Sequence, residues 1–293
     1  MKIKAGIIGG RGVLGSYIFS SQEQFEWFSF PGDVTKPDDL TLWVSTLPKL
    51  EIIIHSAAVV PVSKVDASPE YAMQVNAEGV RNTIQALHAG NQLKNLWFFF
   101  PSTAHVYRPS EQAIPEIHQT DPISYYGKTK LAGESILQEL AELYSFQYCI
   151  GRIFSYTAPM QLKEFVIPSL HQRIQFAAPH EKVFIKGATN IRDFLTAEKI
   201  ATIIQQLALY RYQGIINIGS GIPLSIQEIA QEIKMRLNRN DIYLDFDNQI
   251  PTRLVANVDK LKQLSLYDSI TLPELVSHYI QGIKTREKTH AVI

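Results

Sequence analysis

The sequence predicts an α/β fold, a Rossmann-type doubly wound parallel sheet followed by a smaller C-terminal α/β region. Three observations support this prediction. Short β-rich runs alternate with helical patterns over residues 3–153, an order typical of parallel strands joined by right-handed crossovers. Residues 52–54 are all isoleucine, as expected for a strand that helices cover on both faces. A glycine-rich turn joins the first strand to the first helix.

Composition excludes several classes of protein. The 28 Lys and Arg balance 28 Asp and Glu, so no net charge attracts nucleic acid or an anionic membrane. A single cysteine, Cys149, excludes an internal disulfide framework and fits a reducing compartment. No apolar run reaches membrane-spanning length, and the apolar part of the N-terminus is too short for a signal peptide. We expect a cytoplasmic protein with no nucleic-acid or membrane partner.

The expected elements can be given by residue range. Strands of the first part are expected at residues 3–8, 26–30, 52–55, 96–100 and 146–153. Its helices are expected after the glycine turn to about residue 20, at 38–47, at 69–89 and around the Tyr126 to Lys130 stretch. The remainder is expected to mix short strands (183–186, 215–218, 242–246) with helices (197–210, 225–237, 273–283). The polar end, residues 284–293, is expected to fray.

The glycine-rich turn has the context that a dinucleotide-binding loop requires, between a strand and a helix. Gly9 would allow a tight turn, Gly12 would let a pyrophosphate approach the backbone, and Gly15 would let the helix pack closely on the strand. A glycine-rich loop without a ligand gives the same pattern. The loop residues expected to bind a cofactor are Gly9, Gly10, Arg11, Gly12, Val13, Leu14 and Gly15.

The second strand bears on the choice between NAD and NADP. An acidic residue at its end often binds the adenosine ribose diol, but Phe30 stands there. Arg11 lies in the glycine loop instead, where its guanidinium could pair with a ribose 2′-phosphate, although a solvated loop arginine is an equal alternative. The expected cofactor is NAD or NADP, with a lean to NADP. Asp33 and Val34 follow, where the next turn could reach the adenine.

Small residues follow the third strand. Ser56, Ala57 and Ala58 would let a flat cofactor lie against the backbone at the strand's carboxyl end. His55, just before them, is expected to be a packed histidine and not a metal ligand. The eight histidines form no H-x-H or H-E-x-x-H pair, so no metal site is expected.

Tyr126 and Lys130 are four residues apart, so in a helix their side chains share one face. A neighbouring ammonium lowers the pKa of a phenol by about one to three units, which makes it a usable acid and base near neutral pH. A surface helix with a buried ring and a solvated amine gives the same spacing. Thr103 follows a buried strand and is expected to face the crevice at the sheet's carboxyl edge. Asn76, on a packed helix, can bond a neighbouring backbone group.

Six stretches, in this order, resemble the extended short-chain dehydrogenase/reductase family, in its nucleotide-sugar epimerase, dehydratase and reductase branch. The resemblance covers nearly the whole chain. The stretches are Gly9-x-x-Gly12-x-x-Gly15, Pro101-Ser102-Thr103-Ala104-His105-Val106-Tyr107, Pro122-Ile-Ser-Tyr-Tyr126-Gly127-Lys-Thr-Lys130-x3-Glu134, Arg152-Ile-Phe-Ser155, Ile191-Arg192-Asp193-Phe194 and Asn217-Ile218-Gly219-Ser220-Gly221.

The resemblance implies roles for particular residues. Thr103, Tyr126 and Lys130 would be catalytic, and Ser102, Tyr126 and Lys130 would also contact the cofactor. Residues expected to bind the substrate are Thr103, Ser155, Val166, Arg192 and Arg253, with Arg192 at a nucleotide diphosphate and Arg253 a weaker candidate for the same group. Ser155 departs from the family's usual Asn. Residues 1–155 would form the NAD(P)-binding domain, with later segments free to return to it, and residues 156–293 mainly a substrate-binding region.

Two departures shape the expected reaction. Sugar 4,6-dehydratases typically carry Asp-Glu after the catalytic Thr, and Ala104-His105 stands there, which disfavours water elimination. Arg11 and the short second-strand region resemble NADP-using 4-keto-sugar reductases. We therefore expect an NAD(P)-dependent oxidoreductase that reduces a 4-keto nucleotide-diphosphate sugar. An NAD-dependent epimerase and a non-catalytic NAD(P)-binding sensor are the alternatives, and a homodimer is common among the proteins it resembles.

Overall fold

The computed structural model describes residues 2–20 and 23–290. The chain divides into two compact units. The first unit holds Met1–Arg108, Glu116–Ile153 and Ile200–Ile218, and the second holds Pro109–Pro115, Phe154–Lys199 and Gly219–Ile293. The chain therefore leaves the first unit after Ile153 and returns to it for one further helix and strand.

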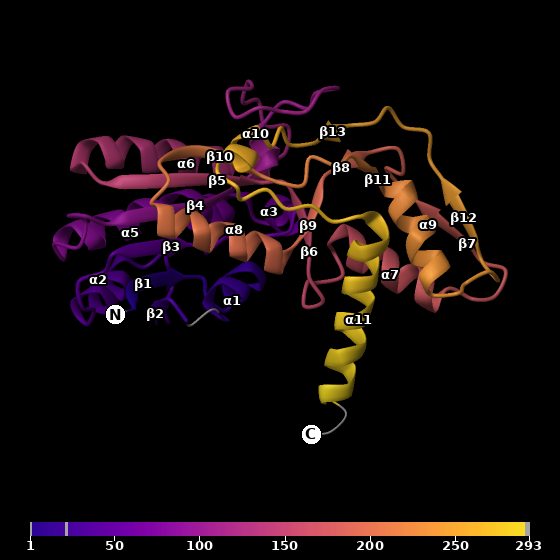
Figure 1. Ribbon diagram of the computed structural model, residues 1–293, viewed down its shortest axis with the longest axis horizontal. Coiled ribbons are helices and arrows are strands. Elements are labelled where there is room, and N and C mark those ends of the chain that lie inside the picture. The colour runs from indigo at the N-terminus through magenta and orange to yellow at the C-terminus, as the bar shows by residue number, and fades with distance from the viewer. Residues whose placement is uncertain (1, 21–22, 291–293) are drawn as a thin grey trace. The chain divides into compact units, whose positions relative to one another are not determined.

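A six-stranded parallel sheet, in the order β10-β5-β4-β3-β1-β2, forms the centre of the first unit (Figure 1). Its strands are β1 Ile3–Ile8, β2 Phe25–Ser29, β3 Ile52–His55, β4 Trp97–Thr103, β5 Gln147–Ile153 and β10 Gly214–Ile218. The strand order reverses between β1 and β3, and α/β sheets bind ligands beyond the carboxyl ends of the strands at such a point. The predicted Rossmann-type sheet is confirmed.

Helices cover both faces of this sheet. They are α1 Val13–Ser20, α2 Pro37–Ser45, α3 Val62–Ala67, α4 Pro69–Met73, α5 Gly79–Ala89, α6 Tyr125–Tyr144 and α8 Ala197–Tyr210, with a π turn η1 at Gln74–Glu78 and a 3₁₀ turn η2 at Ala104–Val106. On one face, α2, α5 and α6 pack on alternate strand residues that include Ile53, Phe98 and Phe100, all fully buried. Each such side chain contributes about 1.5–3 kcal/mol to the stability of the fold.

The predicted helix over residues 69–89 forms, but it is interrupted at Asn76. This residue lies in the π turn η1, and its Oδ1 accepts a hydrogen bond from Val59 N at 2.7 Å. Its amide nitrogen donates to Val59 O at 3.3 Å and to Thr129 Oγ1 on α6 at 3.0 Å. The prediction that Asn76 bonds a neighbouring backbone group is confirmed.

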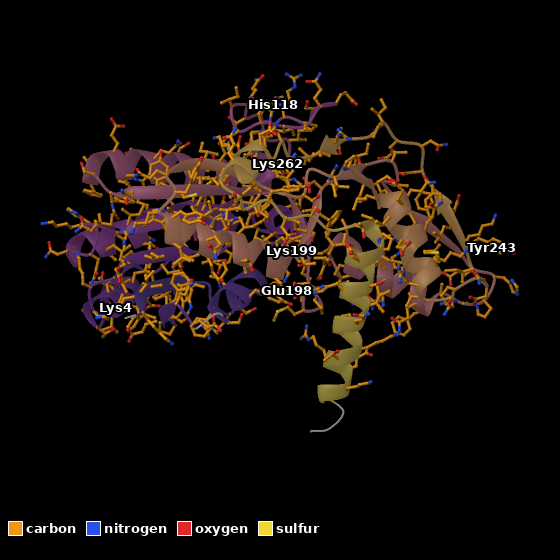
Figure 2. The ribbon with its side chains drawn as sticks, in the orientation of Figure 1. Lys4, His118, Glu198, Lys199, Tyr243 and Lys262 are labelled. Carbon is orange, nitrogen blue, oxygen red and sulfur yellow. The ribbon has the colours of Figure 1, made fainter. Side chains whose placement is uncertain are left out.

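The second unit contains short strands and four helices. Its strands are β6 Ser155–Thr157, β7 Lys182–Ile185, β8 Ile191–Arg192, β9 Phe194–Thr196, β11 Leu224–Ser225, β12 Tyr243–Phe246 and β13 Arg253–Leu254. They form a three-stranded sheet, β11-β8-β13, and the pairs β12-β7 and β6-β9. The helices are α7 Val166–Phe176, α9 Ile226–Arg236, α10 Asp259–Gln263 and α11 Leu272–His290. Tyr243 on β12 lies at the surface of this unit (Figure 2).

Helix α11 corrects one expectation. Residues 284–290 continue the helix, so the prediction that the polar end frays from residue 284 is wrong for that part; residues 291–293 lie outside the described residues. Contacts within the unit hold the helix: Arg286 Nη1 donates to Pro159 O at 3.1 Å, and a Cβ added at Gly282 would lie 2.1 Å from the Pro159 ring. Over residues 2–20 and 23–290, none of the helices combines the length and apolar character needed to cross a bilayer.

We predict that Gly133→Ala destabilises the first unit. A Cβ at Gly133 would lie 2.7 Å from Asn76 O and 2.8 Å from the Phe100 ring, so α6 would have to move away from β4 and η1. Overpacking of this kind costs about 1–3 kcal/mol. Urea unfolding measures the change, with Ser135→Ala, an exposed position on the same helix, as the control. Equal stability of the two variants would show that α6 does not approach η1 this closely.

Candidate active site

The glycine loop between β1 and α1 has a conformation that depends on its glycines. Gly9 has φ +83°, and a Cβ there would lie 2.5 Å from Ala57 N. A Cβ at Gly15 would lie 2.1 Å from Gly9 O, so this glycine is needed for the helix to approach the turn. A Cβ at Gly12 would meet only Gly9 O, at 3.3 Å. Packing within the protein therefore favours glycine less strongly at position 12 than at positions 9 and 15.

A pocket of about 270 Å³ opens beside this loop. Six residues expected to bind the cofactor or to stand near it line the pocket: Gly9, Gly10, Arg11, Asp33, Val34 and Ala57. Other expected cofactor-binding residues of the loop and of the end of β3 do not line it: Gly12, Val13, Leu14, Gly15, Ser56 and Ala58. The sequence did not indicate Tyr71 of α4, which also lines the pocket and is half exposed. Phe30 lines the pocket where an acidic residue was expected in the family pattern.

Two charged groups face this pocket. Arg11 Nη2 donates to Pro31 O at 3.0 Å, so its guanidinium lies at the end of β2. The Oδ1 of Asp33 accepts hydrogen bonds from Thr35 N at 2.9 Å and Thr35 Oγ1 at 2.8 Å. The hydrogen bond from the Thr35 backbone lowers the pKa of Asp33, which is therefore ionised at neutral pH. A cation and an anion thus both stand where the adenosine end of a dinucleotide would lie.

His55, at the end of β3, is a packed core histidine, as predicted. It is fully buried, and its Nδ1 lies 3.2 Å from Thr83 Oγ1. Since the Thr83 hydroxyl donates to Gly79 O at 2.8 Å, we assign the imidazole proton to Nδ1. Burial, together with a smaller effect of the Lys130 charge, lowers the pKa of His55 to about 3, so the ring is neutral at neutral pH. No cluster of three His, Cys, Asp or Glu side chains suited to a metal ion occurs in the described part of the chain.

Thr103 and Tyr126 come together where β4 ends and α6 begins. Thr103 is the last residue of β4, and its Oγ1 accepts a hydrogen bond from His105 N at 3.2 Å. The first turn of α6 packs on this turn: a Cβ at Gly127 would lie 2.2 Å from His105 O, and the Tyr126 and His105 rings lie edge to face at 5.9 Å. The Ser124 hydroxyl caps the helix by accepting from Gly127 N at 3.1 Å.

Lys130 lies one turn further along the same face of α6. It is 2% exposed, and its Nζ stands 3.9 Å from the centre of the Phe100 ring. Burial lowers the pKa of Lys130 to about 7, while the charge of Glu134 opposes this effect. Ser102, expected to contact the cofactor, is also buried, and its hydroxyl donates to Glu134 Oε1.

Apart from Thr103, which ends β4 in the first unit, the expected substrate residues lie in the second unit. Arg192 on β8 donates to Ile191 O, Thr252 O and Thr252 Oγ1 at 2.7–2.8 Å, and burial lowers its pKa. Arg253 on β13 pairs in register with Ile191, and its Nε is buried without a hydrogen-bond partner. No carboxylate pairs with either arginine within the described residues. Ser155 begins β6, and Val166 begins α7 with 40% of its surface exposed.

Asp193, which follows Arg192, orders this region. Its carboxylate is fully buried and accepts hydrogen bonds from Ser220 N and Oγ at 2.6 Å, Gly221 N at 2.8 Å and Ala256 N at 3.0 Å. Burial raises the pKa of Asp193, and the hydrogen bonds oppose the rise. The sequence pattern marked the Arg-Asp-Phe stretch, but it did not indicate that its Asp joins three separate segments.

We predict that Lys130→Met stabilises the fold, most strongly at low pH. The pKa of Lys130 is about 7 in the folded protein, against 10.5 for an unperturbed lysine. Between these values the unfolded chain binds more protons, so the free energy of unfolding rises with pH, and the cost of burying the charge is complete below about pH 7. The gain should be on the order of 3 kcal/mol near pH 6.5 and smaller near pH 9.5.

Urea unfolding at the two pH values measures this gain. Lys128→Met, at an exposed position on the same helix, is the control and should change little at either pH. A Lys130→Met variant that is no more stable than wild type near pH 6.5 would contradict a buried, strained ammonium.

Comparison with known proteins identifies the family. A sequence profile described as the NAD dependent epimerase/dehydratase family matches residues 5–219. A putative UDP-glucose 4-epimerase of Methanocaldococcus jannaschii is 25% identical over 244 residues, 82% of this chain and 79% of that protein. The GDP-6-deoxy-D-mannose reductase of Pseudomonas aeruginosa is 26% identical over 208 residues, 68% of this chain and 66% of that protein.

A solved structure agrees. RMD from Pseudomonas aeruginosa, complexed with NADPH, superposes with a TM-score of 0.87 at 20% identity, over 97% of this chain and all of that chain. The resemblance that the six sequence stretches indicated is confirmed. The chain belongs to the NAD dependent epimerase/dehydratase family, whose members are NAD(P)-dependent enzymes that act on nucleotide sugars.

Proposed function

We propose that this enzyme reduces the keto group of a 4-keto nucleotide-diphosphate sugar with NADPH. The observation that carries the proposal is the junction of β4 and α6. There Tyr126 lies in the first turn of α6 beside the turn that follows Thr103, and the buried Lys130 lies one turn further along the helix. A phenol, a hydroxyl and an ammonium at the carboxyl edge of the sheet are the groups that carbonyl reduction requires.

The glycine loop fits a dinucleotide. Packing favours glycine less strongly at Gly12 than at Gly9 and Gly15, and the absent side chain would let a pyrophosphate approach the backbone there. The N-terminus of α1 would offer backbone N–H groups and the positive end of a helix dipole to that pyrophosphate. When bound, the nicotinamide supplies the hydride. Arg11 favours NADP because it is a cation at the end of β2, and Asp33 has one carboxylate oxygen already engaged by Thr35.

The three catalytic residues have different tasks in this proposal. Tyr126 donates a proton to the keto oxygen as the carbonyl is reduced. The Lys130 ammonium stabilises the phenolate that remains and holds the hydroxyls of the nicotinamide ribose. The Thr103 hydroxyl donates a hydrogen bond to the reacting oxygen; within the described residues its proton has no other acceptor. Ser102 has no direct part in the proton transfer in this proposal, because its hydroxyl donates to Glu134.

Arg192 and Arg253 would bind the nucleotide diphosphate. Both are partly buried cations without a carboxylate partner in the described part of the chain, which favours an anionic ligand. Arg192 is fixed through Thr252, whose hydroxyl donates to Asn190 Oδ1 at 2.8 Å. Ser155 and Val166 are the further candidates for contact with the sugar.

A cytoplasmic location and a homodimer remain predictions.

An epimerase is the second candidate function, because the Methanocaldococcus jannaschii relative is a putative UDP-glucose 4-epimerase. The same three side chains would serve it, with the hydride returned to the opposite face of the sugar. Elimination of water is disfavoured, because Ala104 and His105 place no carboxylate after Thr103.

A panel of nucleotide 4-keto sugars with NADPH and NADH, followed at the nicotinamide absorbance band, tests the proposal. Stoichiometric cofactor consumption supports the reductase. The corresponding 4-hydroxy sugars are assayed with NAD in parallel. Their epimerisation without net cofactor consumption, with no 4-keto sugar reduced, would indicate the epimerase and overturn the proposed reduction.

We predict that Tyr126→Phe lowers the rate of reduction by about 10² to 10⁴, because the proton donor is lost while the ring remains. Single-turnover oxidation of bound NADPH measures the rate. Tyr125→Phe, at the adjacent and partly exposed tyrosine, is the matched control and should retain the wild-type rate. Equal rates in the two variants would remove Tyr126 from the chemistry.

We predict that Arg11→Ala weakens NADPH binding about tenfold and leaves NADH binding nearly unchanged. The variant loses a charge-assisted contact to the 2′-phosphate, which is absent from NADH. Fluorescence titration gives both dissociation constants. Arg81→Ala, which breaks an exposed pair with Glu78 in the same unit, is the control. If Arg11→Ala weakens both cofactors equally, Arg11 does not select NADP.

A further inference from the structure

A third ionisable residue, Glu134, follows Tyr126 and Lys130 on the same face of α6. The three are spaced four residues apart, and Glu134 is 1% exposed. A buried carboxylate is strongly unfavourable without a cation, and the Lys130 ammonium, one helical turn away, is the nearest candidate on the helix. Sequence spacing alone would therefore pair Lys130 with Glu134 and take the ammonium away from the active site.

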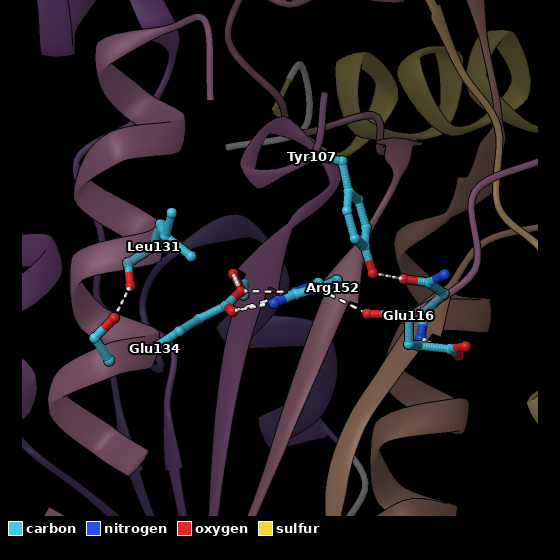
Figure 3. Close-up of polar contacts among 8 residues, drawn as sticks. Tyr107, Glu116, Leu131, Glu134 and Arg152 are labelled. Carbon is cyan, nitrogen blue, oxygen red and sulfur yellow. Dashed lines mark hydrogen bonds and ion pairs between the residues drawn. The ribbon is translucent and has the colours of Figure 1, made fainter. Parts of the chain in front are cut away.

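The structure pairs Glu134 with Arg152 of β5 instead (Figure 3). Arg152 Nη2 donates to Oε2 at 2.6 Å, and Nε donates to Oε1 at 3.1 Å, so the contact is bidentate. The Ser102 hydroxyl donates to Oε1 from the β4 side. Both oxygens of the carboxylate are therefore engaged by groups on the sheet.

Arg152 is itself fixed on its other side. Its Nη1 donates to Glu116 O at 3.2 Å, and its guanidinium lies 4.7 Å from the centre of the Tyr107 ring. Tyr107 is held in turn, because its hydroxyl donates to Asn217 Oδ1 at 2.7 Å (Figure 3). These contacts hold the guanidinium against Glu134.

Lys130 is left without an acidic partner in contact. Its Nζ stands over the Phe100 ring at 3.9 Å, and it forms no ion pair within residues 2–20 and 23–290. An ammonium held by a ring face and not by a carboxylate retains its hydrogen-bond donors for another acceptor.

We propose that Arg152, with Ser102, is a positioning residue that holds the Glu134 carboxylate on the sheet and so keeps the Lys130 ammonium free for the cofactor and Tyr126. This positioning role rests on the function proposed above for Lys130. The observed contacts among Arg152, Ser102 and Glu134 do not depend on that function. Arg152 touches neither substrate nor cofactor in this proposal; it acts on Lys130 through Glu134.

Few other ionisable groups surround Lys130. Tyr126 and Glu134 share its face of α6, and the neighbouring strands and turn carry His55 of β3, His105 of η2, and Tyr148, Cys149 and Arg152 of β5. His55 is neutral, and β4 carries no ionisable side chain. The charged residues of α3, α4, η1 and α5 are exposed or, for Arg81, paired with Glu78. Glu134 is therefore the group whose position most directly sets the protonation of Lys130.

The proposal predicts opposite effects for the two partners. Glu134 raises the pKa of Lys130 against the larger effect of burial. Glu134→Gln should therefore lower the pH at which Lys130 titrates. Arg152→Met should raise it by about one unit or more, since the released carboxylate can approach the ammonium. In a Glu134→Gln background, Arg152→Met should shift the midpoint little, because the carboxylate through which it acts is gone.

NMR titration of the protein labelled with ¹³Cε-lysine measures this midpoint without any cofactor or substrate. The Lys130 resonance is assigned by its loss in Lys130→Met. The dissociation constant of NADPH as a function of pH is the second readout, and it should rise about tenfold in Arg152→Met as the ammonium is drawn away. Arg152→Lys, which keeps a cation beside Glu134, should restore part of the affinity.

A midpoint that moves in the same direction in both single variants, or that does not move in Arg152→Met, would overturn the proposal. If Arg152→Met does not fold, Ser102→Ala decides, because it removes one of the two hydrogen bonds to Oε1 and leaves Arg152 in place. An upward shift supports the proposal, and an unchanged midpoint contradicts it. If Lys130 titrates as predicted but no 4-keto sugar is reduced, the positioning role stands and the proposed function fails.

Discussion

The burial of one ammonium, that of Lys130, is the constraint on which the active site depends. The helix α6 places it against the sheet with almost no exposed surface, and Phe100 stands beneath it. Desolvation lowers the pKa of Lys130 to about 7, so the fold makes this ammonium easier to deprotonate than a lysine in water. Functional sites commonly hold such unfavourable groups, and here the ammonium stands one turn from the Tyr126 phenol.

The surrounding structure maintains this arrangement. The close approach of Gly133 to Asn76 O and Phe100 brings α6 down on the sheet, and Gly127 brings its first turn against the turn after Thr103. Asn76 holds the π turn η1 and bonds Thr129, which neighbours Lys130. The side of α6 that faces the sheet thus fixes the phenol, the ammonium and the carboxylate at successive turns.

Much of the fold and of the candidate site could be predicted from the sequence. The apolar strands, the glycine turn and the spacing of Tyr126 and Lys130 are local signals, and the structure brings Tyr126 and Thr103 to one junction. Other features depend on tertiary contacts. Tyr71 gives no local sign that it lines the pocket, and the pairing of Glu134 with Arg152 joins a helix to a strand 18 residues later. Residues 284–290 read as a polar tail, yet packing against Pro159 keeps them helical.

Transfer of deuterium from NADPH labelled at the hydride position tests the central claim most directly. The enzyme is mixed with labelled NADPH and a nucleotide 4-keto sugar, and the product is analysed by mass spectrometry and NMR. If Tyr126 and Lys130 serve carbonyl reduction, one deuterium appears at carbon 4 of the sugar for each NADPH oxidised. An unlabelled isomerised sugar with the cofactor unchanged, or no transfer to any 4-keto sugar, would contradict it.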